Sequence, residues 1–270
     1  LPLSFPGRPD RAAAIRTIHA ALDAGVRVID TADAYCLDAS ELGHGELLVA
    51  EALATWSGDA SEVLVATKGG HTRGADGSWD LDGRPEHLRA ACEASLGRLG
   101  GEAIGLYQLH RPDPKVPFEE SVGALRELRD AGLIRMAGVS NVDEAQIRAA
   151  REIAAVEAVQ NELSPAFRSS EGELALCERL GIAFLPWSPF GGIGKAGRLG
   201  EAYDAFAEVA REHDVSPQRV CLAWLLAKSP ALIAIPGASR PETILDSVAA
   251  AELQLTDDEL ARLDAATGGR

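Results

Sequence analysis

Seven short apolar runs alternate with helical segments along this chain, and each run ends in residues that can take part in chemistry. In a parallel β/α barrel the carboxyl ends of the strands converge on one face, and the active site lies on that face. The pattern therefore predicts a barrel whose strand ends present Asp, Lys, His, Ser, Asn and Gln side chains. The runs are 26–29, 63–66, 104–109, 134–139, 156–159, 183–186 and 232–235.

The segments between the runs have the apolar spacing of amphipathic helices, with capping residues at their ends. Pro85 suits a first helical turn, Thr256 is an N-cap residue, and Gly25 and Gly132 follow helix ends. Runs that are apolar on both faces indicate a parallel sheet covered by helices. Helices are predicted over 10–24, from 40 onward, and over 84–100, 117–131, 143–153, 170–180, 203–213, 216–228, 241–251 and 257–266.

The predicted fold is a (β/α)8 TIM barrel. Such a barrel has eight strands, whereas seven runs are readable, so we expect the first strand to lie upstream of Leu1. An open doubly wound sheet is the alternative, and it is disfavoured because no Gly-x-Gly-x-x-Gly follows any run. No linker or low-complexity segment interrupts residues 1–270, which predicts a single domain.

Composition excludes several classes of partner. The net charge of −15 repels phosphate backbones, so nucleic acid is not an expected partner, and no apolar run approaches the ~20 residues that cross a bilayer. The four cysteines form no Cys-x-x-Cys pair, which disfavours a disulfide framework and a metal site and fits a reducing compartment. With no readable secretory signal, we expect a cytoplasmic protein.

Four strand-end residues form a candidate catalytic group: Asp30, Tyr35, Lys68 and His110. A phenol has a pKa of about 10, and a neighbouring ammonium lowers that pKa by stabilising the phenolate. Asp30 beside Lys68 keeps the ammonium charged, and His110 can orient or polarise a carbonyl oxygen. Each residue alone also fits a structural role, as a loop carboxylate, a packing tyrosine, a solvated lysine or a turn histidine. Their combination favours a proton donor for carbonyl reduction.

The motifs that contain these residues resemble signatures of the aldo-keto reductase superfamily, in order along nearly the whole chain. The matching segments are Ile29–Tyr35, Ala66–Gly69, Leu106–His110, Gly138–Asn141, Val159–Asn161 and Pro186–Pro189. The resemblance implies a (β/α)8 barrel that binds NADP(H) in extended form without a Rossmann motif. It also implies Tyr35 as proton donor, with Asp30, Lys68 and His110 completing a tetrad.

The resemblance further implies the cofactor contacts. Ser140, Asn141 and Gln160 would hold the nicotinamide carboxamide, and Trp187 would stack on the ring, although a barrel-rim packing role is open for this tryptophan. The pyrophosphate would pass along Ser188, Pro189, Phe190, Gly191 and Gly192, with Lys195 and Arg198 folding over it, or with this loop simply solvated.

Adenosine recognition in the family follows the last strand. Here that segment contains Gly237, Ala238, Ser239, Arg240 and Thr243, with Asp246 and Ser247 one turn later. Many relatives carry a basic residue at the position of Gly237 and an arginine at that of Thr243, so Arg240 would have to bind a 2′-phosphate largely alone. NADP(H) is therefore the expected cofactor, with NAD(H) as the alternative.

The leading hypothesis is an NADP(H)-dependent reductase of a small-molecule aldehyde or ketone. A non-catalytic, redox-sensing barrel is the second hypothesis, and a Schiff-base aldolase that uses Lys68 is the third. Substrate specificity is expected from the loop after the first readable strand, from Trp79 and from segments near the later strand ends. The candidates are Cys36, Leu37, Trp79, Arg111–Val116, Phe190 and the C-terminal tail.

Overall fold

The computed structural model describes residues 2–192 and 194–267. Contacts between Cα atoms divide the chain into two compact units, which are described separately. The first unit contains Leu1–Val159 and Ala238–Pro241, and the second contains Gln160–Gly237 and Glu242–Arg270.

The first unit is built on parallel strands that follow one another in chain order. Asp30 is paired in register with Ala66, and Lys68 with Gln108, so the carboxyl ends of neighbouring strands lie together. Sheet order equals chain order, with none of the reversal that defines a doubly wound sheet. The strands are β1 (Val28–Asp30), β2 (Leu64–Gly69), β5 (Ile104–Leu109) and β6 (Ile134–Ser140), and β7 (Val156–Glu162) begins in this unit.

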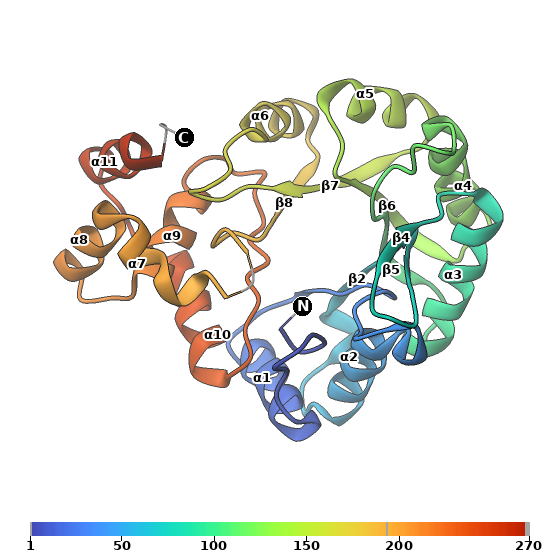
Figure 1. Ribbon diagram of the computed structural model, residues 1–270, viewed down its shortest axis with the longest axis horizontal. Coiled ribbons are helices and arrows are strands. Elements are labelled where there is room, and N and C mark those ends of the chain that lie inside the picture. The colour runs from blue at the N-terminus through green and yellow to red at the C-terminus, as the bar shows by residue number, and fades with distance from the viewer. Residues whose placement is uncertain (1, 193, 268–270) are drawn as a thin grey trace. The chain divides into compact units, whose positions relative to one another are not determined.

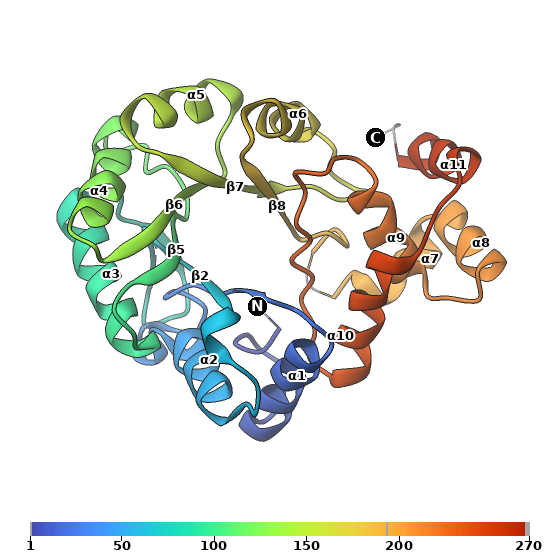
Figure 2. The same cartoon turned by 180° about the vertical axis from the view of Figure 1, so that it is seen from behind.

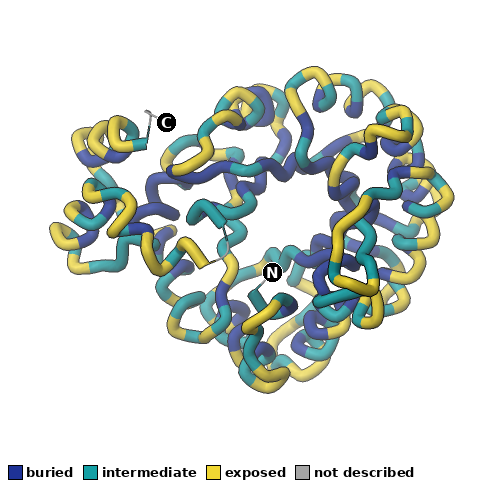
Figure 3. The backbone as a smooth tube through the Cα atoms, in the orientation of Figure 1, coloured by how far each residue is buried: buried dark blue, intermediate teal, exposed yellow. Residues whose placement is uncertain are grey.

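Five helices lie on the outer side of these strands in both views (Figures 1 and 2), and their outward faces are exposed (Figure 3). Asp10 caps the first helix by accepting a hydrogen bond from the backbone of Ala13, and Asp143 and Gln146 form a capping box on the last. The helices are α1 (Arg11–Asp23), α2 (His44–Thr55), α3 (Pro85–Leu99), α4 (Phe118–Asp130) and α5 (Glu144–Ile153).

The core between α1, α2 and the sheet contains only aliphatic side chains at its centre. Ile18 and Leu22 from α1 pack with Leu48 and Val49 from α2, and Val65 of β2 packs against this cluster. The apolar stripes predicted for these helices therefore face the strands, which removes their surface from water.

One predicted helix begins later than the sequence indicated. The segment from Ser40 forms a short 3₁₀ turn, η1 (Ala39–Glu41), and the α-helix starts only at His44. Asp38 caps the 3₁₀ turn by accepting from the Ser40 backbone, and Gly43 has a φ of 84° that interrupts any continuous helix. A second 3₁₀ turn, η2 (Ala60–Glu62), precedes β2.

An antiparallel hairpin that the apolar pattern did not predict follows β2. Its strands β3 (His71–Arg73) and β4 (Trp79–Leu81) pair with each other as a separate two-stranded sheet. Both strands are short and half-polar, so they give no apolar run. Gly77 in the connecting turn has a φ of 80°, a conformation that glycine adopts most readily.

The second unit contains the remaining helices and strand β8 (Ala183–Trp187). The prediction of a regular strand over 232–235 is wrong. Leu232 forms only an isolated parallel bridge with Phe184, and Pro236, which lacks an N–H, ends the run. The helices are α6 (Glu171–Leu180), α7 (Leu199–Ala202), α8 (Asp204–Glu212), α9 (Pro217–Leu226), α10 (Pro241–Val248) and α11 (Asp257–Thr267), with 3₁₀ turns η3 (Ala196–Arg198) and η4 (Ala249–Glu252).

All four cysteines lie in the described part of the chain, are buried and carry free thiols. Burial raises the pKa of Cys92 and of Cys177 to about 12, so these thiols act as small apolar side chains. Of the helices in the described ranges, none combines the length and apolar character needed to cross a membrane.

Candidate active site

The loop after β1 folds back over the end of β2 and buries the predicted proton donor. The backbone N–H of Thr31 donates to the Ala66 carbonyl at 2.8 Å, and the N–H of Tyr35 donates to the Ala32 carbonyl at 3.2 Å. These bonds close a tight turn in which Tyr35 keeps only 6% of its surface exposed. The position of the phenol is thus set by backbone hydrogen bonds as well as by packing.

Lys68 makes direct contacts with two other predicted catalytic residues, Asp30 and Tyr35. Its ammonium, at the end of β2, is fully buried and donates to Asp30 Oδ2 at 2.7 Å, to the Thr31 carbonyl at 2.8 Å and to the Tyr35 hydroxyl at 3.2 Å. All three ammonium hydrogens therefore have an acceptor. A carboxylate and a phenol thus share one buried cation.

The protonation states of this cluster follow from burial and charge together. Burial works to lower the pKa of Lys68, but the charge of Asp30, the phenolate of Tyr35 and the hydrogen bonds to both outweigh it, so this pKa is raised. Burial raises the pKa of Tyr35, and the nearby Lys68 opposes that effect without overcoming it. The expected lowering of the Tyr35 pKa is therefore wrong, because burial is the larger effect.

His110, directly after β5, completes the group from the neighbouring strand. Its ring lies edge-on to Tyr35, with the ring centroids 5.7 Å apart, and its backbone N–H donates to the Gly69 carbonyl at 2.9 Å. Burial, with help from the charge of Lys68, lowers the pKa of His110 well below its ordinary value. The imidazole is therefore neutral, and it can donate an N–H hydrogen bond without competing as a proton donor.

A second buried acidic group, which the sequence pattern did not single out, lies beside the first. Glu46 of α2 accepts from the Thr67 hydroxyl at 2.6 Å and from Arg98 Nε at 2.5 Å. Burial, with Glu46 nearby, raises the pKa of Asp33 to about 8, against the opposing effects of the Ala34 N–H and Arg98. The signal available in the sequence was the second aspartate of the Asp-Thr-Ala-Asp-Ala-Tyr segment.

The β3–β4 hairpin places an aromatic wall next to the catalytic group. The His71 ring lies 4.4 Å from that of His110 and perpendicular to it, and 5.1 Å from that of Trp79. Phe5 stacks on Trp79 at 5.9 Å and meets Tyr35 edge-on at 6.0 Å. The wall is continuous from the phenol to the hairpin, and it includes Trp79, which was expected to contribute to specificity.

Ser140 and Asn141, at the end of β6, lie in the first unit with the catalytic group. The amide of Asn141 donates to the His110 carbonyl at 2.9 Å and to the Ser140 hydroxyl at 3.0 Å, while Arg111 donates to its oxygen at 2.9 Å. Asn141 also has a φ of 60°, a left-handed conformation that asparagine tolerates. A ligand amide that bound here would share or replace the contact with Arg111.

Gln160 and Trp187, which were expected at the nicotinamide, fall in the second unit, as do the residues expected along the pyrophosphate. Gln160 is buried within β7, and Trp187 ends β8 with its indole N–H shielded from solvent and without a partner among the described residues. After β8 the chain turns tightly, because the Gly191 N–H donates to the Ser188 carbonyl at 2.7 Å. The expected positions Ser188, Pro189, Phe190, Gly191, Gly192, Lys195 and Arg198 all lie on this turn or the segment that follows it, and Arg198 is paired with Glu201.

The expected adenosine segment shows one arrangement that the sequence did not predict. The Asp246 carboxylate is held by Arg219, at 3.0 Å and 2.7 Å, and by the hydroxyl of Ser216, so it is already engaged. The Ser247 hydroxyl donates to the Thr243 carbonyl at 3.0 Å. By contrast, Arg240 is exposed and has no ion pair within the described ranges. Gly237, Ala238 and Ser239 lead into α10 beside it.

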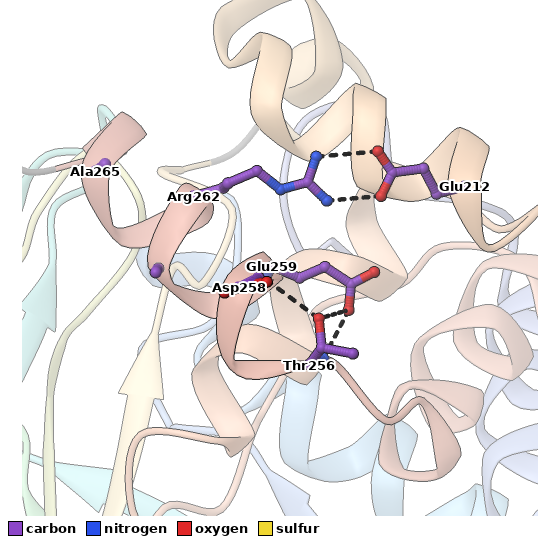
Figure 4. A pocket seen from close by; sticks show the side chains of 7 residues that line it. Glu212, Thr256, Asp258, Glu259, Arg262 and Ala265 are labelled. Carbon is purple, nitrogen blue, oxygen red and sulfur yellow. Dashed lines mark hydrogen bonds and ion pairs between the residues drawn. The ribbon is translucent and has the colours of Figure 1, made fainter.

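A shallow hollow in the second unit has a different character (Figure 4). An ion pair and a hydrogen bond border this hollow. Arg262 donates to Glu212 at 3.0 Å and 2.6 Å, and the Glu259 carboxylate accepts from the Thr256 backbone N–H at 2.6 Å. These groups satisfy one another, and none of the predicted catalytic residues lines the hollow. Across the described residues, no group of three or more His, Cys, Asp and Glu side chains is placed to hold a metal ion.

Comparison with known proteins identifies the family. The chain is 36% identical over 257 residues to an uncharacterised oxidoreductase of Schizosaccharomyces pombe, covering 94% of this chain and 79% of that protein. The solved structure of a glycerol dehydrogenase from Gluconobacter oxydans matches with a TM-score of 0.81 at 30% identity, covering 95% of this chain and 85% of that one. An aldo-keto reductase from Klebsiella pneumoniae, solved in complex with NADPH, matches with a TM-score of 0.80 at 27% identity, over 96% and 86% of the two chains.

These structural matches confirm the expected barrel fold class. The sequence model of the aldo/keto reductase family matches residues 4–267, which is nearly the whole chain. The protein therefore belongs to the aldo/keto reductase family of oxidoreductases.

Proposed function

We propose that this protein is an NADPH-dependent reductase that converts an aldehyde or ketone to an alcohol, with Tyr35 as the proton donor. The observation that carries the proposal is the single buried ammonium of Lys68, which contacts both the Asp30 carboxylate and the Tyr35 hydroxyl. Family membership supports reductase chemistry, and the NADPH complex of the Klebsiella relative supports the cofactor.

NADPH, when bound, supplies hydride to the carbonyl carbon. The raised pKa of Tyr35 keeps its phenol protonated at neutral pH, so a proton is available for the carbonyl oxygen. Lys68 stabilises the phenolate that remains after transfer, and Asp30 holds the ammonium in its charged form. Neutral His110 can donate an N–H hydrogen bond to the same oxygen without taking over the proton transfer.

The chain's residues fit a dinucleotide. The glycine turn after Ser188 offers backbone N–H groups, and Arg240 offers an exposed cation with no ion pair among the described residues. We assign Ser140, Asn141, Gln160 and Trp187 to the nicotinamide, the Ser188–Gly192 turn with Lys195 and Arg198 to the pyrophosphate, and the segment from Gly237 through Ser247 to the adenosine.

The Schiff-base use of Lys68 is disfavoured by the same contacts. Attack on a carbonyl carbon needs the neutral amine, whereas Asp30 and Tyr35 hold the pKa of Lys68 above its ordinary value. Borohydride treatment with a carbonyl substrate is expected to leave Lys68 unlabelled.

Replacement of the phenol tests the proposal directly. Tyr35→Phe is expected to lower kcat with 4-nitrobenzaldehyde by about 10²–10⁴-fold, because the proton donor is lost. NADPH affinity, measured by fluorescence titration, should stay within about twofold of the wild type, since the phenyl ring keeps the packing. An unchanged kcat would remove Tyr35 from the mechanism, and a wild type that binds NADPH but oxidises none would favour a regulatory barrel.

Cofactor choice is tested at Arg240. Arg240→Ala should weaken NADPH binding by about 10–100-fold and NADH binding by less than about twofold, because only NADPH carries the 2′-phosphate. Equal weakening of both cofactors would show that Arg240 does not bind that phosphate.

A further inference from the structure

Arg73, on strand β3 of the hairpin, carries hydrogen-bond donors that the protein does not satisfy. Its Nη2 donates to the Leu37 carbonyl at 2.5 Å. Its Nε and Nη1 are shielded from solvent, yet within residues 2–192 and 194–267 neither has a hydrogen-bond partner. An unpaired buried N–H of a charged group is costly, so this arrangement points to an acceptor that binds from outside the chain.

The aromatic rings around Arg73 stabilise its charge without accepting these hydrogen bonds. The guanidinium carbon lies 4.0 Å from the Trp79 ring centroid and 5.9 Å from that of Phe5. Aromatic faces attract a cation, but they accept no hydrogen bond from N–H groups in the guanidinium plane. No acid in the described ranges lies within ion-pair distance of Arg73. It is an unneutralised cation in a chain of net charge −15.

Arg73 also lies close to the proposed catalytic residues. The Phe5 ring lies between the guanidinium carbon, 5.9 Å from its centroid, and the Tyr35 ring, with the two centroids 6.0 Å apart. Trp79 is linked through His71 to His110 by edge-on ring contacts. Cys36, the residue directly after Tyr35, is near enough that the charge of Arg73, and hydrogen bonding from Arg73 to the ionised thiol, oppose the effect of burial on the pKa of Cys36. The guanidinium therefore lies at one end of a wall of rings whose other end is the phenol.

We propose that Arg73 is a specificity-determining residue that binds a carboxylate on the carbonyl substrate, and that the preferred substrates are aldehydes or ketones carrying such a carboxylate. This inference rests on the proposed function of the site. Nη2 carries a second N–H besides the one that it donates to Leu37, so a planar carboxylate can accept from Nη2 together with either Nη1 or Nε, and its single charge balances the single charge of Arg73. The aromatic wall favours a flat segment between the carbonyl and the carboxylate.

The test compares two substrates that differ in one charge. 4-Formylbenzoate carries a carboxylate opposite its aldehyde, and methyl 4-formylbenzoate is its neutral ester. In Arg73→Met, kcat/KM for 4-formylbenzoate should fall by about 10–100-fold, mainly through KM, while kcat/KM for the ester changes by less than about twofold. Arg73→Lys should recover only part of the loss, because an ammonium lacks the planar pair of donors.

Arg84→Met is the matched control, since it removes an arginine from the same unit that is exposed and paired with Asp82. It should leave both substrates unaffected. Equal losses of Arg73→Met on acid and ester would overturn the inference and assign Arg73 to support of the aromatic wall. No loss on either would also overturn it and assign water to the two donors.

An equilibrium measurement separates this inference from the proposed function. Calorimetric titration with 4-formylbenzoate needs no turnover and should give binding that Arg73→Met weakens by about 10-fold or more. If no carbonyl is reduced but this binding persists, the proposed reductase function fails and the carboxylate site stands. If aldehydes are reduced and the carboxylate binds no better than the ester, the carboxylate site fails and the reductase stands.

Discussion

Strand β2 contacts a buried cation–carboxylate pair on each of its faces. Lys68 points to one face and meets Asp30, while the preceding residue, Thr67, points to the other and meets the Glu46–Arg98 pair. Lys68 and Glu46 both have no exposed surface. Both pairs thus contact β2, and each contains one fully buried charged residue.

The two pairs differ in what else they contact. The oxygens of Glu46 are occupied by a hydroxyl and a guanidinium, neither of which exchanges protons near neutral pH. The ammonium of Lys68 has a phenol as an additional partner, and the neutral imidazole of His110 lies next to that phenol. A buried ion pair alone is therefore a structural feature, and an adjoining proton donor is what makes it a candidate for catalysis.

The largest expected effect comes from breaking the Lys68 pair. Lys68→Met removes the cation that we propose to stabilise the phenolate, so kcat for 4-nitrobenzaldehyde should fall by about 10²–10⁴-fold. Steady-state kinetics at saturating NADPH measures this loss, and circular dichroism checks that the fold is retained. Turnover within about threefold of the wild type would mean that the two faces of β2 do not differ in function.

The next largest effect is expected on stability, at the Glu46–Arg98 pair on the other face of β2. Glu46→Ala leaves Arg98 without its carboxylate and the Thr67 hydroxyl without its acceptor, which should lower the free energy of unfolding by about 3–5 kcal/mol. Urea denaturation measures the change. The control Glu46→Gln keeps an acceptor for Thr67 and should lose less. The comparison fails if kcat per folded molecule drops for Glu46→Gln as sharply as for Lys68→Met.

The smallest expected effect is a pH dependence of stability that arises at Asp33, whose pKa is influenced by Lys68 and by the Glu46–Arg98 pair. Its pKa is about 8 in the folded protein, against 3.8 for the free side chain, so the folded state holds a proton that the unfolded state has released at pH 6–8. Stability should therefore fall as pH rises through this window, by about 2 kcal/mol between pH 6 and 8.

Asp33→Asn sharpens that prediction, because the amide cannot ionise and its oxygen can still accept from the Ala34 N–H. The variant should lose most of the slope of unfolding free energy against pH. Denaturant titrations at pH 6, 7 and 8 provide the measurement. A variant with the same slope as the wild type would assign the pH dependence to another group.

The sequence predicted the contact between Lys68, Asp30 and Tyr35 because parallel strands place their carboxyl ends together and the apolar runs located those ends. It did not predict the direction of the Tyr35 pKa, since burial depends on loops that fold back from β1. It also missed the unsatisfied donors of Arg73, because a short polar hairpin gives no apolar run. The prediction of a strand over 232–235 failed for the opposite reason. This segment is apolar enough to suggest a strand, but its backbone forms only an isolated bridge.

The hairpin β3–β4 forms a sheet of its own and is not part of the parallel sheet. Its residues can therefore be exchanged as a cassette without altering the pairing of the strands that hold Lys68 and His110. Exchange of the hairpin is therefore expected to change which molecules the proposed active site accepts while the proposed proton-transfer residues keep their places. Grafting segment 71–81 onto a relative is the route by which a preference for charged substrates could be transferred.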